Sequence, residues 1–256
     1  MSDWKPSLYL KFDRERTQPA LDLALRVKEL ISNPKRIADL GCGPGNSTRV
    51  LSRVFPGSGI TGLDSSPDMI KRAKSENPDI EFRLCDARSV KGGCDLIFSN
   101  ACLQWIERHD ELIPMLISRL NPGGVLAVQV PNNSEEPFFK LIEEVAAEKR
   151  WGLSDVSEDR RNGGVLSPME YYDILAGVSS GFDIWETKYY HTLSDHSALA
   201  EWARGTRLRP YLERLDGDSA DEFIEELTLR SRELYPPKRD GSVVLCFRRL
   251  FFTAVK

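Results

Sequence analysis

A glycine-rich segment between two short apolar runs constrains the fold of this chain more than any other feature. It reads Asp39-Leu-Gly-Cys-Gly-Pro-Gly45, and the apolar run that follows it ends in Asp64. Glycines at 41 and 43 can adopt positive φ and let backbone N–H groups approach a ligand. A carboxylate at the end of the next strand suits the two hydroxyls of a ribose. The pattern is typical of a strand, loop, helix and strand that bind an adenosine-containing cofactor.

The spacing of the glycines distinguishes between such cofactors. The dinucleotide fingerprint Gly-x-Gly-x-x-Gly requires a glycine at position 46, where this chain has Asn46; its own pattern is Gly41-x-Gly43-x-Gly45. Asp39 precedes the loop, where a carboxylate suits a cation and repels a pyrophosphate. S-adenosylmethionine carries an ammonium group and a sulfonium but no phosphate. The sign of the charge therefore favours S-adenosylmethionine.

Length and composition are those of an ordinary globular protein. The chain has 256 residues, of which 41% are hydrophobic and 29% are charged. Its apolar runs are too short to span a membrane and its first residues include no apolar secretory core, so we expect a cytoplasmic protein without a membrane partner. The net charge of −4 argues against a nucleic-acid partner, which needs a basic face. The oligomeric state stays open.

Cysteine and histidine do not form a metal-binding pattern. The 5 cysteines include no Cys-x-x-Cys pair, and the 3 histidines are scattered along the chain. We therefore expect reduced, mostly buried thiols rather than disulfides or zinc ligands, and no metal site.

Strands and helices are predicted to alternate along the first half of the chain. The predicted strands are residues 36–40, 59–64, 80–85, 94–99 and 125–130. Alternation of this kind implies right-handed crossovers and a parallel sheet, in which ligands bind at the carboxyl ends of the strands. Asp39, Asp64, Asp86 and Asn100 all fall at that edge of the predicted sheet.

The pattern changes beyond residue 131. Further strands are predicted at 182–191 and 242–255, with about fifty mostly helical residues between them. We interpret residues 194–237 as a helical insertion that forms a substrate cap. The whole chain, 1–256, is predicted to be one domain.

These motifs resemble those of the class I S-adenosylmethionine-dependent methyltransferases. The resemblance covers residues 10–130 and rests on the glycine loop, Asp64, Asp86 and Asn121-Pro-Gly-Gly124 in their expected order. It implies an α/β fold: a doubly wound, mostly parallel, seven-stranded Rossmann-like sheet with an antiparallel last strand and a helical insertion. It also implies that residues 36–131 are the cofactor-binding half.

The resemblance implies a set of cofactor contacts. Asp64 would bind the ribose hydroxyls, Asp86 the adenine amino group with Ala87 beside it, and Asn100 would lie near the reactive end. The rest of the predicted cofactor-binding set is Tyr9, Arg16, Asp39, Gly41, Cys42, Gly43, Ser65, Met69 and Gln104. Residues 1–16 are predicted to form an N-terminal lid.

Within this class the chain is similar, over nearly its whole length, to the branch that esterifies trans-aconitate, a small tricarboxylate. The phrases that carry this similarity are Ser2–Leu10, Gly62–Pro67, Leu103–Trp105, Tyr171–Leu175, Tyr189–His191 and Leu208–Pro210. The implied product is a monomethyl ester. No catalytic residue is predicted, because a carboxylate with a pKa near 4 is ionised at pH 7 and needs no general base.

Three carboxylates call for matched donors, and bidentate arginine is the natural one. That branch commonly has glycine where this chain has Arg207, which makes Arg209 the first candidate. The predicted substrate-binding set is Phe12, Trp105, Tyr172, His191, Arg207 and Arg209. The alternatives are solvated helix charges for the arginines, a core position for Trp105 and a structural role for His191.

Other functions stay open at this point. A methyltransferase acting on a macromolecule or an acyl carrier would want a basic docking surface or an open cleft. A nucleotide-binding oxidoreductase is disfavoured, because it would have a third glycine at position 46 and no Asp39. A cofactor sensor without activity would not need an arginine-lined cavity beside the methyl group.

Overall fold

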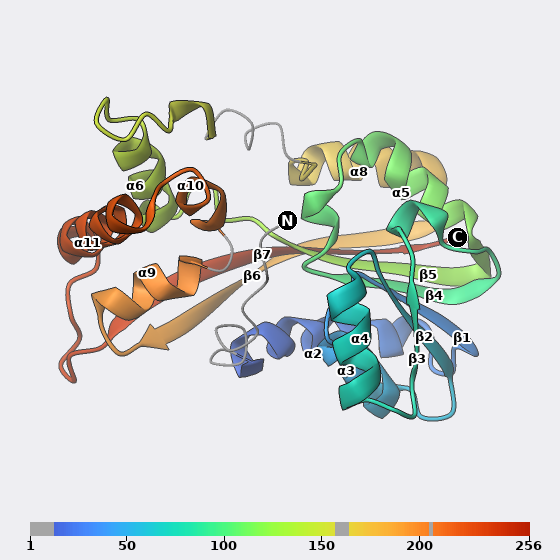
Figure 1. The fold of residues 1–256 in the computed structure, drawn as a ribbon. Coiled ribbons are helices and arrows are strands. Elements are labelled where there is room, and N and C mark those ends of the chain that lie inside the picture. Colours follow the sequence, from blue (N-terminus) through green and yellow to red (C-terminus); the bar gives the residue numbers. More distant parts are fainter. Residues whose placement is uncertain (1–12, 157–163, 205–206) are drawn as a thin grey trace. The chain divides into compact units, whose positions relative to one another are not determined.

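The computed structural model describes residues 13–156, 164–204 and 207–256, with the side chains of 13–16 left out. The chain divides into two compact units. The sheet unit consists of Arg14–Pro131, Gly164–Thr187 and Arg249–Lys256. The helical unit consists of Met1–Asp13, Asn132–Gly163 and Lys188–Arg248. Figure 1 shows the elements of both units in sequence colours.

A seven-stranded sheet is the central element of the fold, with strand order β3-β2-β1-β4-β5-β7-β6 (Figure 1). The strands are β1 (Arg36–Leu40), β2 (Gly59–Asp64), β3 (Glu81–Leu84), β4 (Cys94–Asn100), β5 (Leu120–Pro131), β6 (Gly181–Leu193) and β7 (Val243–Val255). Strands β1 to β5 pair in parallel, whereas β7 runs antiparallel to β5. The predicted doubly wound α/β fold with an antiparallel last strand is confirmed.

Helices connect the strands in the alternation that the sequence predicts. They are α2 (Asp13–Leu30), α3 (Asn46–Val54), α4 (Pro67–Glu76), α5 (His109–Ser118), α6 (Pro137–Ala146), α8 (Pro168–Val178), α9 (His196–Arg204), α10 (Arg209–Leu212) and α11 (Gly217–Leu234), with the short 3₁₀ turns η1 (Ala87–Ser89) and η2 (Leu103–Trp105). Helix α4 begins where the Ser66 hydroxyl accepts the Met69 N–H. Helix α8 begins with a capping box between Ser167 and Glu170.

The main core of the sheet unit joins the central strands to α5 and α8. Leu40, Ile97 and Val128 of three neighbouring strands belong to one buried cluster with Leu116 of α5 and Leu175 of α8. These strands are nearly continuous apolar runs because a parallel sheet has both faces covered. The core therefore fixes the strand ends, where the predicted ligand-binding residues lie.

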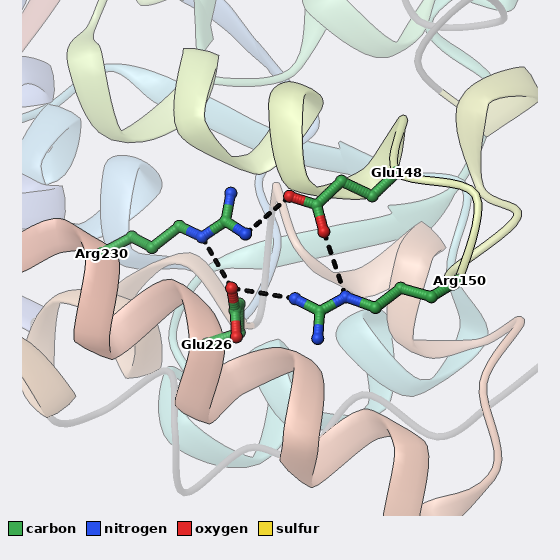
Figure 2. Close-up of polar contacts among 4 residues, drawn as sticks. All are labelled: Glu148, Arg150, Glu226 and Arg230. Carbon is green, nitrogen blue, oxygen red and sulfur yellow. Dashed lines mark hydrogen bonds and ion pairs between the residues drawn. The ribbon is translucent and has the colours of Figure 1, made fainter.

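The helical unit has a core and a charged surface of its own. Its core includes Phe138 and Ile142 of α6, Trp202 of α9 and Phe223 of α11. Figure 2 shows an ion-pair network on this unit. Arg230 bonds Glu148 and Glu226 at 2.6 Å each, and Arg150 lies 3.0 Å from Glu148 and 2.9 Å from Glu226. The network joins α11 to the segment that follows α6.

Several boundaries differ from the prediction, and three of these differences change the character of a segment. Helix α6 ends at Ala146, well before the expected residue 151, because tighter turns follow it and Gly152 adopts a positive φ of 63°. Asn100 is the last residue of β4 rather than part of a loop. Strand β5 starts at Leu120 and includes the predicted turn. Within the described ranges, none of the helices combines the length and the apolar character that crossing a bilayer requires.

Candidate active site

The glycine loop after β1 has the backbone conformation that its sequence predicts. Gly41, Gly43 and Gly45 have φ values of 66°, 54° and 97°. A Cβ at position 41 would lie 2.2 Å from the Sγ of Cys102, so no larger residue fits there. A Cβ at position 43 would meet no atom of the described residues within 4 Å, which leaves that part of the backbone accessible to a ligand. Cys42 between them is buried.

Asp64 ties the end of β2 to this loop. Its Oδ2 accepts the backbone N–H of Gly43 at 2.9 Å, and its Oδ1 accepts the N–H of Ser66 at 2.8 Å. The N–H groups of Gly41 and Cys42 are bonded to the carbonyl of Leu63. The carboxylate is thus held in one orientation at the carboxyl edge of the sheet. Ser65 beside it is exposed.

Asp39 is fully buried and only half satisfied. The hydroxyls of Ser47 and Thr48 donate to its Oδ2 at 2.7 and 2.6 Å. Its Oδ1 has no hydrogen-bond partner among the described residues. Burial raises the pKa of Asp39 to about 7, although the two hydroxyl donors act to lower it. A buried carboxylate oxygen without a donor is suited to a cationic ligand.

The ends of β2 and β3 carry the residues predicted for the base of the cofactor. Asp86 follows β3 and is exposed; its Oδ1 accepts the Arg88 N–H at 2.7 Å and begins the turn η1. Ala87 beside it is buried. Met69 is half-buried in the first turn of α4, and its N–H points to the Ser66 hydroxyl. These residues come together at the carboxyl edge of neighbouring strands.

Asn100 ends β4, and Gln104 follows the strand at the same edge. The Oδ1 of Asn100 and the Oε1 of Gln104 are buried and have no hydrogen-bond partner in the described ranges. Gln104 donates through Nε2 to the carbonyl of Ala101 at 2.8 Å. Ala101 itself has a φ of 54°, a strained conformation for a residue with a side chain. Strain and unsatisfied oxygens thus occur together where β4 ends.

A buried histidine holds the turn that carries Gln104. His109 Nε2 lies 2.9 Å from the carbonyl of Leu103, and its Nδ1 lies 2.5 Å from the hydroxyl of Tyr171. Burial lowers the pKa of His109, which keeps the ring neutral. Nε2–H then donates to Leu103, and the Tyr171 hydroxyl donates to Nδ1. Sequence reasoning missed this pair, because the two residues are 62 positions apart.

Two predicted substrate residues of the sheet unit are exposed. Trp105 on η2 is 64% exposed, so the alternative of a core position is wrong. Tyr172 is 52% exposed and packs edge-on against Phe182. It lines a hollow of about 500 Å³ between α8 and the strands β6 and β7. Because β6 ends the sheet opposite β3, Tyr172 is not brought together with Asp39 on β1, Asp64 at the end of β2 and Asp86 after β3.

The other predicted substrate residues that the structure describes belong to the helical unit. Arg207 is ion-paired with Glu143, and its guanidinium lies 5.7 Å from the ring centre of Phe139. Arg209 bonds Glu213 at 2.8 Å. Both arginines therefore have carboxylate partners within their own unit.

His191, also of the helical unit, is buried in an aromatic cluster. Its ring centre lies 4.6 Å from that of Trp202 and 5.8 Å from that of Phe247. Tyr9 and Phe12 lie outside the described residues, and Arg16 is in α2 with its side chain outside them.

Comparison with known proteins identifies the family. Residues 12–174 match the family model described as a methyltransferase domain. The chain is 42% identical over 260 residues to the trans-aconitate 2-methyltransferase of Methylobacterium radiotolerans. This alignment covers 100% of this chain and 99% of the relative. The chain belongs to the methyltransferase family that includes the trans-aconitate 2-methyltransferases. It is also 45% identical over 256 residues to the enzyme of that name from Escherichia coli, covering 99% and 98% of the two chains.

A solved methyltransferase structure has a fold similar to that of this chain. The phosphoethanolamine N-methyltransferase 2 of Haemonchus contortus, in complex with phosphomonomethylethanolamine and S-adenosylhomocysteine, aligns with a TM-score of 0.55. The alignment covers 93% of this chain and 52% of that chain at 18% identity. At this identity the likeness supports the fold, which is that of the methyltransferases.

Proposed function

We propose that this methyltransferase transfers the methyl group of S-adenosylmethionine to one carboxylate of trans-aconitate. Similarity over the whole chain to relatives with this activity in their names, at 42% and 45% identity, carries the choice of substrate. The half-satisfied Asp39 behind the glycine loop supports the choice of cofactor, because its buried Oδ1 suits an ammonium group.

The residues at the carboxyl edge fit S-adenosylmethionine. Asp64, already oriented by two backbone donors, would accept the ribose hydroxyls. Asp86 and Ala87 would hold the adenine, and the loop at Gly41, Cys42 and Gly43 would hold the methionine end. The proposed set also includes Tyr9, Arg16, Ser65, Met69, Asn100 and Gln104.

The chemistry requires placement rather than proton transfer. S-adenosylmethionine supplies a methyl group bound to a positively charged sulfur. A substrate carboxylate is ionised at pH 7, so its oxygen can form the new C–O bond without a general base. The side chains of this chain then have to orient the acceptor and exclude water, and orientation of this kind is worth roughly 7 to 11 kcal/mol. We accordingly propose no catalytic side chain.

The sequence supports a further proposal about the acceptor. Residues 194–237 would act as the substrate cap and residues 1–16 as a lid, with Phe12, Trp105, His191, Arg207 and Arg209 as acceptor contacts. Tyr172 is left out of this set because of its place beside β6. For Arg209 this means exchange of its partner Glu213 for a substrate carboxylate. Such an exchange costs little, since a partly exposed pair contributes about 1 kcal/mol or less.

Incubation of the purified chain with S-adenosylmethionine and trans-aconitate tests the proposal. We expect a monomethyl ester and S-adenosylhomocysteine in equal amounts by mass spectrometry, and much slower turnover of cis-aconitate or citrate. Binding of S-adenosylmethionine without ester formation from any of these acids would refute the substrate and leave the cofactor in place.

A further inference from the structure

Four polar side chains from four adjacent strands lie in a row on one face of the sheet. Asp39 is on β1, Asn100 on β4, Gln129 on β5 and Arg249 on β7. Asn100 is paired with Gln129. The β4 residue opposite Asp39 comes two positions before Asn100. The β7 residue opposite Gln129 comes two positions after Arg249. Because side chains of a strand alternate between faces, all four are on the same face, toward the carboxyl ends of the parallel strands.

The inner part of this row is buried and has an unsatisfied donor. Gln129 is 0% exposed and Arg249 is 5% exposed. Arg249 donates through Nη1 to the Oε1 of Gln129 at 3.2 Å. This bond orients the amide, and its Nε2 has no hydrogen-bond partner among the described residues. Asn100 next to it is partly exposed, so the row reaches the surface there. A buried amide donor of this kind is suited to an oxygen of a ligand.

The row is also polarised. It begins with the carboxylate of Asp39, continues through the neutral amides of Asn100 and Gln129, and ends with the guanidinium of Arg249. Neighbouring strands are about 4.8 Å apart, so β1 and β7 are separated by roughly 14 Å. A cation placed at the Asp39 end and an anion at the Arg249 end would both be stabilised. That is the polarity that transfer from a sulfonium to a carboxylate requires.

We propose that Gln129 and Arg249 bind a carboxylate of the methyl acceptor. The guanidinium supplies the positive charge, and the Gln129 Nε2–H supplies a hydrogen bond to the same anion. The proposal rests on the proposed function, because it assumes an anionic acceptor. It places the acceptor site over β5 and β7, on residues that the sequence analysis did not select.

Replacement of Arg249 by Gln, with Arg248→Gln as the matched control, tests this role. Arg248 is the preceding residue of β7 and is on the opposite face of the strand. For Arg249→Gln we expect kcat/KM for trans-aconitate to fall by about 10- to 150-fold, the range for a hydrogen bond to a charged group. Affinity for S-adenosylmethionine should stay within about twofold, as should both quantities in the control.

A second variant separates binding from folding. Gln129→Glu places a carboxylate beside Arg249 that competes with the acceptor, and it should weaken acceptor binding by a similar factor. Calorimetry of trans-aconitate binding to the complex with S-adenosylhomocysteine measures this without turnover. If Arg249→Gln does not fold, Gln129→Glu decides the question.

A comparison of acceptors tells whether Arg249 and Gln129 contact the acceptor or only stabilise the fold. The probes are trans-aconitate and the dicarboxylates that lack one of its three carboxylates. Wild-type protein should prefer trans-aconitate to the dicarboxylate that lacks the bound group, and Arg249→Gln should lose most of that preference. A variant with a lower melting temperature but unchanged KM and preference overturns the proposal. Wild-type protein that neither binds nor methylates trans-aconitate overturns the proposed function as well.

Discussion

The carboxyl edge of the sheet and the surface of α11 treat their charged and polar side chains in opposite ways. In the sheet unit, Asp39, Asn100 and Gln129 are at one edge, and each has a buried atom without a partner among the described residues. In the helical unit, Arg150 and Arg230 share two glutamates, as Figure 2 shows. An exposed pair contributes about 0 to 1 kcal/mol, whereas an unsatisfied buried group costs about 1 to 3 kcal/mol. Unsatisfied groups therefore indicate ligand binding better than a local abundance of arginine does.

This contrast predicts that the largest loss of affinity comes from replacing a carboxylate of the sheet unit that is proposed to bind the cofactor. Asp64→Ala should weaken S-adenosylmethionine binding by at least about 100-fold, because it removes the proposed ribose contact and the bond that holds the Gly43 N–H. Isothermal calorimetry measures the affinity, and a thermal melt confirms that the variant is folded.

Asp95 offers a matched control at the other end of the strands. Its Oδ2 accepts the backbone N–H groups of Lys35 and Arg36, so this carboxylate also orients a loop. Asp95→Ala should lower the stability and leave the cofactor affinity unchanged. Equal losses of affinity in the two variants would mean that Asp64 acts through loop structure alone.

A smaller effect, with a pH signature, is expected at Asp39. The pKa of Asp39 in the folded state is about 7, above its ordinary value near 4, so the folded protein holds this proton more tightly. Its contribution to stability therefore falls as pH rises from about 4 to about 7. Asp39→Asn should be more stable than wild type at pH 8, by about 1 to 2 kcal/mol in urea unfolding, because the buried charge is gone.

The same variant should bind the cofactor less well. At pH 8 we expect about tenfold weaker binding of S-adenosylmethionine, and the wild-type affinity should rise through pH 7 while that of the variant stays flat. Parallel pH profiles in the two proteins would show that Asp39 does not face the ammonium group.

The smallest effect is expected in the ion-pair network of the helical unit. Glu226→Gln removes a partner of both Arg150 and Arg230, yet these side chains are partly exposed. We expect a loss of less than about 1 kcal/mol in the free energy of unfolding, which disappears in 1 M salt, and no change in KM. A change in KM for the acceptor would show that the charges of this unit take part in binding.

Local patterns were enough to predict the sheet and the edge at which the candidate cofactor-binding residues lie. Strands β1 and β2 have the predicted bounds, and the glycine loop has its positive φ values because steric rules act within a few residues. The position of the carboxylates at one edge followed from the rule that parallel strands have their carboxyl ends at the same edge of the sheet. These features depend on sequence neighbours or on one rule of topology.

Side chains that meet through pairing of distant strands could not be predicted in the same way. In Phe247-Arg-Arg-Leu250 the sequence does not tell which arginine faces the sheet unit's buried row; the register with β5 decides for Arg249. The contact between His109 and Tyr171 likewise depends on how α5 and α8 pack. Trp105 is a large apolar residue that is exposed in the structure. Residue type alone therefore wrongly suggested a position in the core.

The position of β7 has a consequence for synthesis of the chain. It follows both β5 and β6 in sequence, yet it lies between them in the sheet, and Lys256 donates its N–H to the carbonyl of Gly124. Until β7 leaves the ribosome, β5 and β6 each have an open edge that can pair with another chain. The polar row also lacks its guanidinium until then. Completion of the sheet and of the proposed acceptor site thus both wait for β7, so a nascent chain lacking β7 has neither.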